Sequence, residues 1–361
     1  MKNIIFGLLI LSACSPKQKS VEENPLAWYK GNTHTHTILC GHADSHPDTV
    51  ARWYLERGYN FLILSEHNRF IDPDSVNLPE NRREDFILIP GEELTDNEAI
   101  HTTAMNINRL IPINNPLYPK VIAPEEDDNP KVFYMQKHVD STRAIGGIPI
   151  LNHPNFVSGV SAANIQKVKR LHMIELYNGH PTVYNWGNEL HASMEQKWDS
   201  LLTSGKKVYG VSSDDAHDFK MWAPNESNPG RGWVMVQSDQ LTPDAITDAM
   251  AAGNFYASSG VILSNVNITN KQYEVAVDTT STYKETESPF IIGYKNDKRA
   301  DGYSIEFISD GGEVFKKVAS TFAAIEVPEG VGYVRCKITF SRDRGSSSEQ
   351  FFAWTQPVFL N

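Results

Sequence analysis

The sequence predicts an α/β fold followed by a smaller antiparallel β domain. Up to about residue 262, short apolar runs alternate with helix-like segments, which is typical of a β/α barrel or a doubly wound sheet. Polar residues come directly after five of the runs, as they do where strand ends converge on the mouth of a barrel. We therefore predict a barrel over residues 28–262 and a β-sandwich over residues 263–361.

Each apolar run of the barrel region is short enough to be a buried parallel strand. The runs cover residues 61–64, 87–89, 148–151, 174–177 and 208–211. Four other segments are interpreted as helices, two of them with a proline near the start and a glycine after the end. These two are residues 47–57 and 242–252, and the other two are residues 132–145 and 188–204.

The C-terminal region alternates apolar and polar residues and contains turn signals, so we expect antiparallel strands there. The segment Asp310-Gly311-Gly312 is interpreted as the turn of a β-hairpin. The region contains no cluster of catalytic residue types, and a structural role is expected for it. The expected strands cover residues 273–277, 290–294, 304–308, 314–318, 325–327 and 333–340.

The charge balance limits the classes of partner. The chain has 33 Lys and Arg against 44 Asp and Glu, which gives a formal net charge of -11. Such a balance argues against non-specific electrostatic binding to nucleic acid or to anionic lipid. No nucleic-acid partner is expected, and an anionic substrate must be drawn by a local site.

The first residues have the features of a targeting signal. Lys2 is followed by an apolar stretch over residues 4–11, and Leu11-Ser12-Ala13-Cys14 resembles the lipobox of bacterial lipoproteins. We expect residues 1–14 to be the signal peptide, Cys14 to carry the lipid, and residues 15–27 to be a polar tether. The apolar stretch is too short to span a bilayer. The prediction is an exported lipoprotein, periplasmic or outer-membrane associated, with an ordinary cleaved signal peptide as the alternative.

Two further cysteines, Cys40 and Cys336, lie far apart in the sequence, and a disulfide is not indicated. Cys40 lies between His36 and His42, so a metal role is conceivable. We interpret it instead as a small buried residue, because thiols pack well in protein interiors.

Potential metal ligands occur at the ends of the apolar runs. His34-Thr35-His36 places two imidazoles on one face of a strand, and Asp215-Ala216-His217 does the same with a carboxylate and an imidazole. Neutral imidazole and carboxylate are ligands for zinc, manganese or iron. The sequence therefore suggests a multinuclear metallohydrolase with nine ligands: His34, His36, His42, His67, Glu93, His101, His153, Asp215 and His217.

The chain resembles the polymerase and histidinol phosphatase (PHP) superfamily of metal-dependent phosphoesterases. The resemblance lies in motifs that occur in the family's order and cover most of residues 30–262. They are His34-Thr35-His36-Thr37 with His42, Leu64-Ser65-Glu66-His67-Asn68, Gly91-Glu92-Glu93, His101, Asn152-His153-Pro154, and Ser213 to His217.

One branch of the superfamily, which includes carbaryl hydrolase, is more similar still. Residues 228–233, 253–260 and 353–357 look like that branch. The resemblance implies a distorted (β/α)7 barrel of the PHP type followed by the small C-terminal β-sandwich.

The resemblance also implies how two or three divalent ions (Zn, Mn or Fe) are held. One ion is expected on His34, His36, Glu93 and Asp215, and these four residues would be catalytic through a hydroxide shared by the metals. A second ion is expected on His101 and His153, with Glu93 bridging. The third site would consist of His42, His67 and His217.

Some assignments within the motifs stay open at this point. The third site depends on His42, because many family members have an Asp in a Ser-Asp-Gly stretch where this chain has Cys40-Gly41-His42. Glu66 is either a ligand or an orienting residue. Glu93 is preferred over Glu92 because of the Gly-x-Glu spacing, and Asp214 is expected to face away from Asp215.

The substrate contacts are inferred from basic residues near the motifs. A phosphate ester needs a cation or amide donors beyond the metals, and Arg231, in a glycine-flanked loop, is the first candidate. Lys220 and Arg69 follow metal motifs closely and are further candidates. Trp222 and Tyr177 either line the pocket or pack in the core.

The predicted function is hydrolysis of a phosphomonoester or phosphodiester, with a small-molecule or a glycan- or lipid-derived substrate. The alternative enzyme is a metallohydrolase of a carboxyl ester, carbamate or amide bond. A non-enzymatic alternative is a metal-binding surface scaffold, because ligands alone do not prove turnover.

Overall fold

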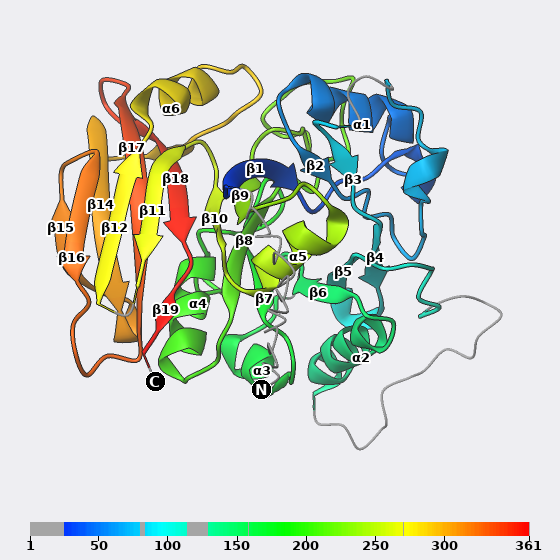
Figure 1. Ribbon diagram of the computed structural model, residues 1–361, viewed down its shortest axis with the longest axis horizontal. Helices are drawn as coiled ribbons and strands as arrows, with labels where there is room; N and C mark the ends of the chain where they lie inside the picture. The colour runs from blue at the N-terminus through cyan, green and yellow to red at the C-terminus, as the bar shows by residue number, and fades with distance from the viewer. Residues whose placement is uncertain (1–24, 80–83, 114–128, 158, 270, 361) are drawn as a thin grey trace, which may run out of the picture.

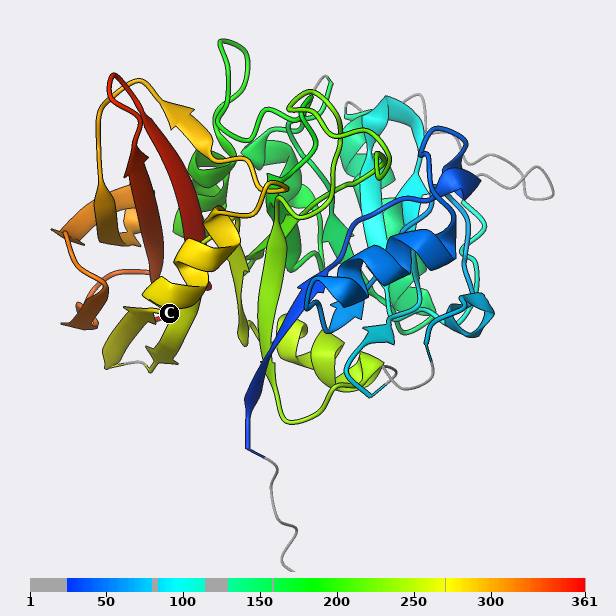
Figure 2. The same cartoon turned by 90° about the horizontal axis from the view of Figure 1, so that it is seen from above.

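In the computed structural model, residues 25–79, 84–113, 129–157, 159–269 and 271–360 are described. The described chain is a mixed α/β protein with three sheets and comparatively few helices. Figures 1 and 2 show the strands from the C-terminal third of the chain gathered on one side of the molecule. The lipidation candidate Cys14, the signal peptide and most of the predicted tether lie outside the described residues.

The N-terminal region contributes strands to two sheets. In the first, β2 pairs in parallel with β1 and β3, while β9 and β10 continue the sheet with antiparallel pairing. In the second, β6, β7 and β8 are parallel, and β4 and β5 join them as an antiparallel hairpin. Their bounds are β1 Ala27–Asn32, β2 Phe61–Leu62, β3 Ile87–Leu88, β4 Gly91–Thr95, β5 His101–Met105, β6 Ile148–Leu151, β7 Met173–Asn178, β8 Tyr209–Ser213, β9 Trp233–Ser238 and β10 Phe255–Ser258.

All five predicted parallel strands are present, although β2 and β3 are shorter than expected. The hairpin of β4 and β5 was not predicted from the sequence, and it interrupts the parallel repeat. The first four residues of β4 are all buried, so the sequence shows no alternation of apolar and polar residues that would mark it as a strand.

The described residues of this region form five α-helices: α1 Pro47–Glu56, α2 Pro130–Ala144, α3 Ala162–Lys167, α4 Met194–Thr203 and α5 Pro243–Ala251. The prediction of a helix from residue 188 was wrong at its start. Helix α4 begins at Met194 because Ser193 and Gln196 form a reciprocal capping box there. The short helix α3, capped by the Ser161 side chain, was not predicted.

Most of the C-terminal strands continue the first sheet, and three of them form a sheet of their own. Strand β10 pairs with β18, and the sheet then runs through β17 and β14 to β15. Strands β11, β12 and β16 form a third sheet, and Tyr273 of β12 packs edge-on against Phe307 of β14. The bounds are β11 Leu263–Ile268, β12 Gln272–Val277, β13 Tyr294–Asn296, β14 Gly302–Ser309, β15 Glu313–Val318, β16 Phe322–Glu326, β17 Tyr333–Asp343, β18 Ser348–Thr355 and β19 Val358–Phe359.

Several details of the C-terminal prediction differ from the structure, which also contains the unpredicted strands β11, β18 and β19. The strand expected at residues 290–294 is wrong in position, because β13 begins only at Tyr294. Helix α6 (Thr279–Thr286), capped by the Asp278 side chain, was not predicted. The hairpin at Asp310-Gly311-Gly312 is confirmed, since β14 and β15 pair in antiparallel register across it.

A buried ionic cluster joins the two regions of the chain. The guanidinium of Arg335 on β17 donates to both carboxylate oxygens of Asp199 on α4, at 2.7 and 2.6 Å. The Tyr333 hydroxyl donates to the same carboxylate at 2.8 Å. Because the Asp199 carboxylate and the Arg335 guanidinium are buried and joined by two hydrogen bonds, they fix α4 against the C-terminal sheet.

Two isolated bridges position the polar strand ends. Thr35, beyond β1, pairs with Ala216, beyond β8, and His67, beyond β2, pairs with Glu93 in β4. These bridges bring together segments from the first and second sheets at one end of the strands. In the described residues, no helix is long and apolar enough to cross a membrane.

Candidate metal centre

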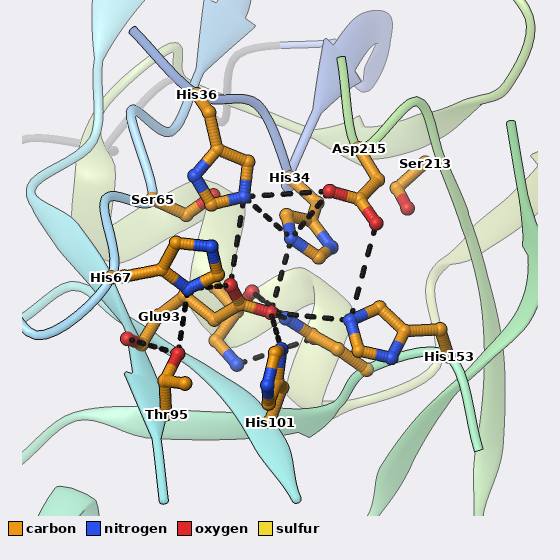
Figure 3. A network of polar contacts seen from close by, with 12 residues as sticks. His34, His36, Ser65, His67, Glu93, Thr95, His101, His153, Ser213 and Asp215 are labelled. Atoms are coloured by element: carbon orange, nitrogen blue, oxygen red, sulfur yellow. Dashed lines mark hydrogen bonds and ion pairs between the residues drawn. The ribbon is translucent and has the colours of Figure 1, made fainter. Parts of the chain in front are cut away.

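The predicted ligands leave the ends of neighbouring strands and converge. His34 and His36 follow β1, His67 follows β2, and His153 follows β6. Glu93 lies within β4 and His101 opens β5, while Asp215 and His217 come directly after β8. Figure 3 shows seven of these side chains turned toward one another, with the Glu93 carboxylate in their centre.

Four of the residues form a compact quartet. The Nε2 atoms of His34 and His36 lie 3.1 Å apart. Asp215 Oδ1 is 3.2 Å from the first of these nitrogens and 3.4 Å from the second. The two oxygens of Glu93 complete the group, with Oε1 at 3.2 Å from His34 Nε2 and Oε2 at 3.5 Å from His36 Nε2.

Glu93 also connects the quartet to three further imidazoles. Its Oε1 lies 3.2 Å from His101 Nδ1 and 3.4 Å from His153 Nε2. Its Oε2 lies 2.7 Å from His67 Nδ1. A single carboxylate is therefore shared between two groups of ligands, which is the position that a bridging ligand occupies in a dinuclear site.

A third group lies on the other side of His36. The ligand atoms of His36, His67 and His217 lie within 4.8 Å of one another. The His42 ring stacks on His67 and His217, with ring centroids 5.2 and 4.6 Å away. His42 is exposed, whereas His217 is buried, so this group lies at the edge of the centre.

The residues present fit a metal ion. Four ligand atoms arranged as a tetrahedron at zinc–ligand distances would lie about 3.3 Å apart. The four closest contacts within the quartet, between 3.1 and 3.4 Å, match that separation. Among the described residues, the buried Nε2 of His217 has no hydrogen-bond partner, which agrees with a role in holding an ion.

The backbone at two ligands is strained. Asp215 has φ +52° and His153 has φ +26°, in a region that residues with a side chain rarely adopt. Such conformations persist where the surroundings hold them, and they concentrate at functional sites. Here they turn both side chains inward at the strand ends.

The electrostatics of the centre follow from the mixture of buried bases and acids. Burial lowers the pKa of His34, but the Asp215, Glu93 and Glu175 carboxylates outweigh it and raise the pKa well above its usual value. Burial raises the pKa of Asp215 and Glu93, but the neighbouring imidazoles, His34 foremost, hold both well below their usual values. Both carboxylates are therefore anionic and suited to a cation.

The residues that orient the ligands were missed by the sequence analysis. Glu175 of β7 accepts from the Nδ1 of His34 at 2.8 Å and from the backbone N–H of His153 at 2.7 Å. The amide of Asn178 donates to Glu175 and, at 3.2 Å, to Asp215. The sequence did contain a signal for Glu175, which is a single acidic residue inside an apolar strand. A buried carboxylate requires polar partners, so such a residue indicates a polar site nearby.

Asn152 supports the bridging residue in the same way. Its side-chain amide donates to Glu93 Oε1 at 2.8 Å, while its carbonyl oxygen accepts from the backbone and hydroxyl of Thr103. The carboxylate of Glu93 is thereby held at Oε1, while His36 lies against Oε2.

The structure separates the acidic residues that the sequence left ambiguous. Glu92 faces away and accepts from the N–H of Ile111, and burial raises its pKa to about 7. Asp214 also faces away, as expected, and accepts from the backbone N–H groups of residues 230–232. Glu66 accepts from the N–H of Thr37 at 2.6 Å and belongs to the surroundings of the third group.

A cavity of about 400 Å³ opens onto the ligands. Besides seven of them, it is lined by Thr95, Phe156, His180 and Thr182. His180 accepts hydrogen bonds at Nδ1 from the N–H and the hydroxyl of Thr182, so its proton resides on Nε2. His180 comes two residues after the end of β7 and was not among the predicted site residues.

The three basic residues proposed for substrate binding do not line this cavity. The guanidinium of Arg231 donates to the carbonyls of Gly179 and Ala223 and lies beside Tyr177 in a neighbouring cavity of about 270 Å³. Lys220 is exposed and donates to the carbonyl of Asp44. Arg69 is exposed.

Trp222 packs outside the cavity as well. Its ring lies against the rings of Trp53 and Phe290. Tyr177, which was considered for the pocket, is a half-buried wall of the neighbouring cavity and stacks on Trp354.

Comparison with known proteins gives similarity only to solved structures. No protein-family model matches the chain, and no curated protein matches it significantly. Among solved structures, the chain is similar to the crystal structure of a two-domain protein from Bacteroides vulgatus ATCC 8482, described as containing a predicted PHP-like metal-dependent phosphoesterase. The identity is 13%, the TM-score is 0.44, and the match covers 94% of this chain and 99% of the other. At this TM-score the similarity carries no argument about mechanism or substrate.

Proposed function

We propose that this protein is a metal-dependent hydrolase of the PHP type that cleaves phosphate monoesters or diesters. The observation that supports the proposal is the spacing of the quartet, in which ring nitrogens and carboxylate oxygens from three strand ends lie 3.1 to 3.4 Å apart around one point. Glu93 adds a shared carboxylate between this point and the pair formed by His101 and His153.

The ions would be held by the chain's own residues in the pattern that the distances suggest. His34, His36, Glu93 and Asp215 would hold one, and His101, His153 and Glu93 a second. Divalent ions bound there would lower the pKa of a coordinated water to roughly 7 and neutralise charge on the substrate. No side-chain nucleophile is then required, and the protein's task is to orient ligands and exclude competing water.

His180 is proposed to assist the departing group. Its Nδ1 is occupied as an acceptor, so Nε2–H is the donor that remains for a substrate in the cavity. A neutral imidazole at this position can hydrogen-bond to the leaving oxygen as charge develops on it.

A second reaction is supported by the lining of the cavity. Among the described lining residues none is Lys or Arg, and Phe156 presents an aromatic ring beside His101 and His153. A flat acyl group would contact such a wall favourably, so a carboxyl ester, carbamate or amide is the alternative substrate.

A panel of chromogenic substrates separates these reactions. The protein is stripped of metal, reloaded with Zn²⁺, Mn²⁺ or Fe²⁺, and offered phosphate monoesters, phosphate diesters, carboxyl esters and carbamates. Metal-dependent release from a phosphate ester that is lost in Asp215→Ala supports the first proposal. Carbamate or carboxyl ester cleavage without phosphate release would replace it with the alternative, and metal binding without any turnover would favour a scaffold.

The architecture and location are proposed to match the same enzyme type. The bridges between Thr35 and Ala216 and between His67 and Glu93 support a distorted (β/α)7 barrel over residues 28–262, with residues 263–361 as its β domain. The lipobox-like sequence ending at Cys14 supports export and anchoring by lipid to a bacterial membrane. Labelling with a lipid precursor, compared with Cys14→Ser, tests the anchor.

A further inference from the structure

Cys40 lies beside the third group of ligands. It ends a short 3-10 turn (η1, Ile38–Cys40) that follows His36 in the chain. Ligand atoms of Cys40, His42 and His217 lie within 4.8 Å of one another, and Cys40 is also within this distance of His36 and Glu66. The thiol is half-buried and forms no disulfide.

The loop that carries Cys40 is built to hold this position. The side chain of Thr37 caps the turn by accepting from the N–H of Leu39, and Gly41 adopts φ +88°, which reverses the chain so that residues on both its sides face the centre. The loop closes through the N–H of Ile38 and the carbonyl of Ser45 at 2.7 Å.

The same loop is tied to the strand end that carries His217. The N–H of Asp44 donates to the carbonyl of His217 at 3.0 Å. The placement of Cys40 against His217 is therefore set by backbone contacts on both sides of the thiol, and not by a freely moving side chain.

His217 provides an independent sign of a ligand at this place. Its side chain is nine-tenths buried, and its Nε2 has no hydrogen-bond partner among the described residues. Its Nδ1 lies 3.0 Å from the carbonyl of Asp215, so Nδ1 carries the proton and Nε2 presents a lone pair. A buried lone pair without a donor requires a cation or a water.

We propose that Cys40 is a thiolate ligand of the third metal site, together with His42 and His217. In a tetrahedral zinc site, sulfur and nitrogen ligand atoms lie about 3.6 Å apart, so ligand atoms already within 4.8 Å need only a small contraction of an exposed loop. This inference rests on the proposed metal centre and adds a ligand type to it. It also reverses the interpretation of Cys40 as a packing residue, because the side chain is not fully buried.

A thiolate changes which ions the third site prefers. Soft sulfur ligands favour zinc over manganese, magnesium and calcium, which prefer oxygen ligands. The quartet, which has two carboxylates and no sulfur, lacks this preference. The centre would then combine one zinc site that contains a thiolate with neighbouring sites of nitrogen and oxygen ligands, which accept a wider range of divalent ions.

Cobalt substitution tests the ligand directly. The full chain is used, with Cys14→Ser in every sample so that Cys40 and Cys336 are the thiols present. The metal-free protein is titrated with Co²⁺ under anaerobic conditions. A sulfur-to-cobalt charge-transfer band in the near ultraviolet is expected, and it should persist in Cys336→Ala and disappear in Cys40→Ser, while the visible bands of the nitrogen and oxygen sites remain.

The outcomes distinguish this inference from the proposed function. Cobalt bands in the visible without a charge-transfer band, or a charge-transfer band that survives Cys40→Ser, would overturn the thiolate ligand and leave the metal centre standing. Absence of any cobalt binding would overturn the metal centre and this inference with it.

Alkylation of the unaltered thiol provides a measurement that needs no Cys40 variant. Peptide mapping follows the reaction of Cys40 with iodoacetamide in the metal-free and the zinc-loaded protein. Zinc is expected to slow modification of Cys40 by about tenfold or more, because a coordinated thiolate is a poor nucleophile towards the reagent. Equal rates in the two forms would contradict the proposal.

Discussion

Glu175 Oε1 lies 2.8 Å from Nδ1 of His34, inside the protein and away from the cavity. This contact fixes the imidazole so that Nδ1 donates to Glu175 and Nε2 is turned toward Glu93 and Asp215, where it would serve as a ligand of a bound ion. The second oxygen of Glu175 holds the backbone of His153. One carboxylate on β7 thus orients ligands of two proposed metal sites.

Replacing Glu175 by Gln is expected to lower metal affinity about 10- to 100-fold. The amide introduces a donor where only acceptors fit, since all the groups that contact this carboxylate donate to it. Competition with a chromogenic chelator measures the affinity. Glu306→Gln, which breaks an exposed ion pair with Lys317, serves as the matched control. Unchanged affinity in Glu175→Gln would remove its orienting role.

The adjacent residues Glu92 and Glu93 are expected to differ sharply when changed to Gln. Glu93→Gln should lower metal affinity by more than the roughly 10- to 100-fold expected for a residue that only orients a ligand. The reason is that the Glu93 carboxylate contacts imidazoles of both ligand groups. Glu92→Gln keeps the acceptor for the N–H of Ile111 and should bind metal normally. Metal content after dialysis, measured by elemental analysis, decides between them, and equal loss in the two variants would contradict the assignment.

His180→Ala is expected to lower kcat by about 10²-fold or more while metal content stays unchanged. The reason is that His180 offers a donor to the cavity but lies outside the quartet. The effects on kcat and KM should be compared. A hydrogen-bond donor to the charge that develops on the leaving oxygen changes kcat more than KM. A variant with wild-type kcat would show that the imidazole is only part of the wall.

Asp199→Ala is expected to destabilise the protein by ~3–5 kcal/mol, because it removes both hydrogen bonds of the buried Arg335 guanidinium to a carboxylate and leaves only Glu195 at 3.6 Å. Urea unfolding followed by fluorescence measures this loss. Asp343→Ala, which removes an ion pair with the exposed Arg299, provides the comparison and should have little effect. Similar unfolding midpoints for the two variants would argue against a stabilising junction between α4 and β17.

Lys197 should make stability depend on pH in the alkaline range. Its ammonium donates to Asn155 and Val160 in the interior, and burial lowers its pKa to about 8 from the usual 10.5. Between these values the unfolded chain holds the proton more tightly, so the free energy of unfolding falls as pH drops from 10.5 towards 8 and levels off below. The difference between wild type and Lys197→Met, from thermal unfolding at several pH values, should show this slope; a pH-independent difference would contradict it.

The strands of the N-terminal region could be predicted because each is a short apolar run with polar residues at its end. The run at residues 174–177 illustrates both the strength and the limit of this pattern, since it located β7 but gave no role to Glu175 inside it. The hairpin of β4 and β5 could not be predicted, because its residues are buried on both faces and show no period.

The substrate residues illustrate a different limit. Lys220 follows a metal motif closely in the sequence, yet its ammonium donates to the carbonyl of Asp44. Arg231 lies in a glycine-flanked loop, and its guanidinium is used by backbone carbonyls of neighbouring loops. Proximity along the chain does not decide which way a long side chain extends. His180, which lines the cavity, is separated from the ligand motifs and was not recognised for the same reason.

The sequence by itself determined which residue types are available: imidazoles and carboxylates after short apolar runs, apolar runs that build sheets, and an excess of acidic over basic residues. These properties depend on residue type and local spacing. The tertiary structure decided which atoms meet, because the contacts of Glu93 with His34, His101 and His67 join strands distant in the chain. It also decided the neighbours of Cys40, since only the folded loop brings its thiol against His217.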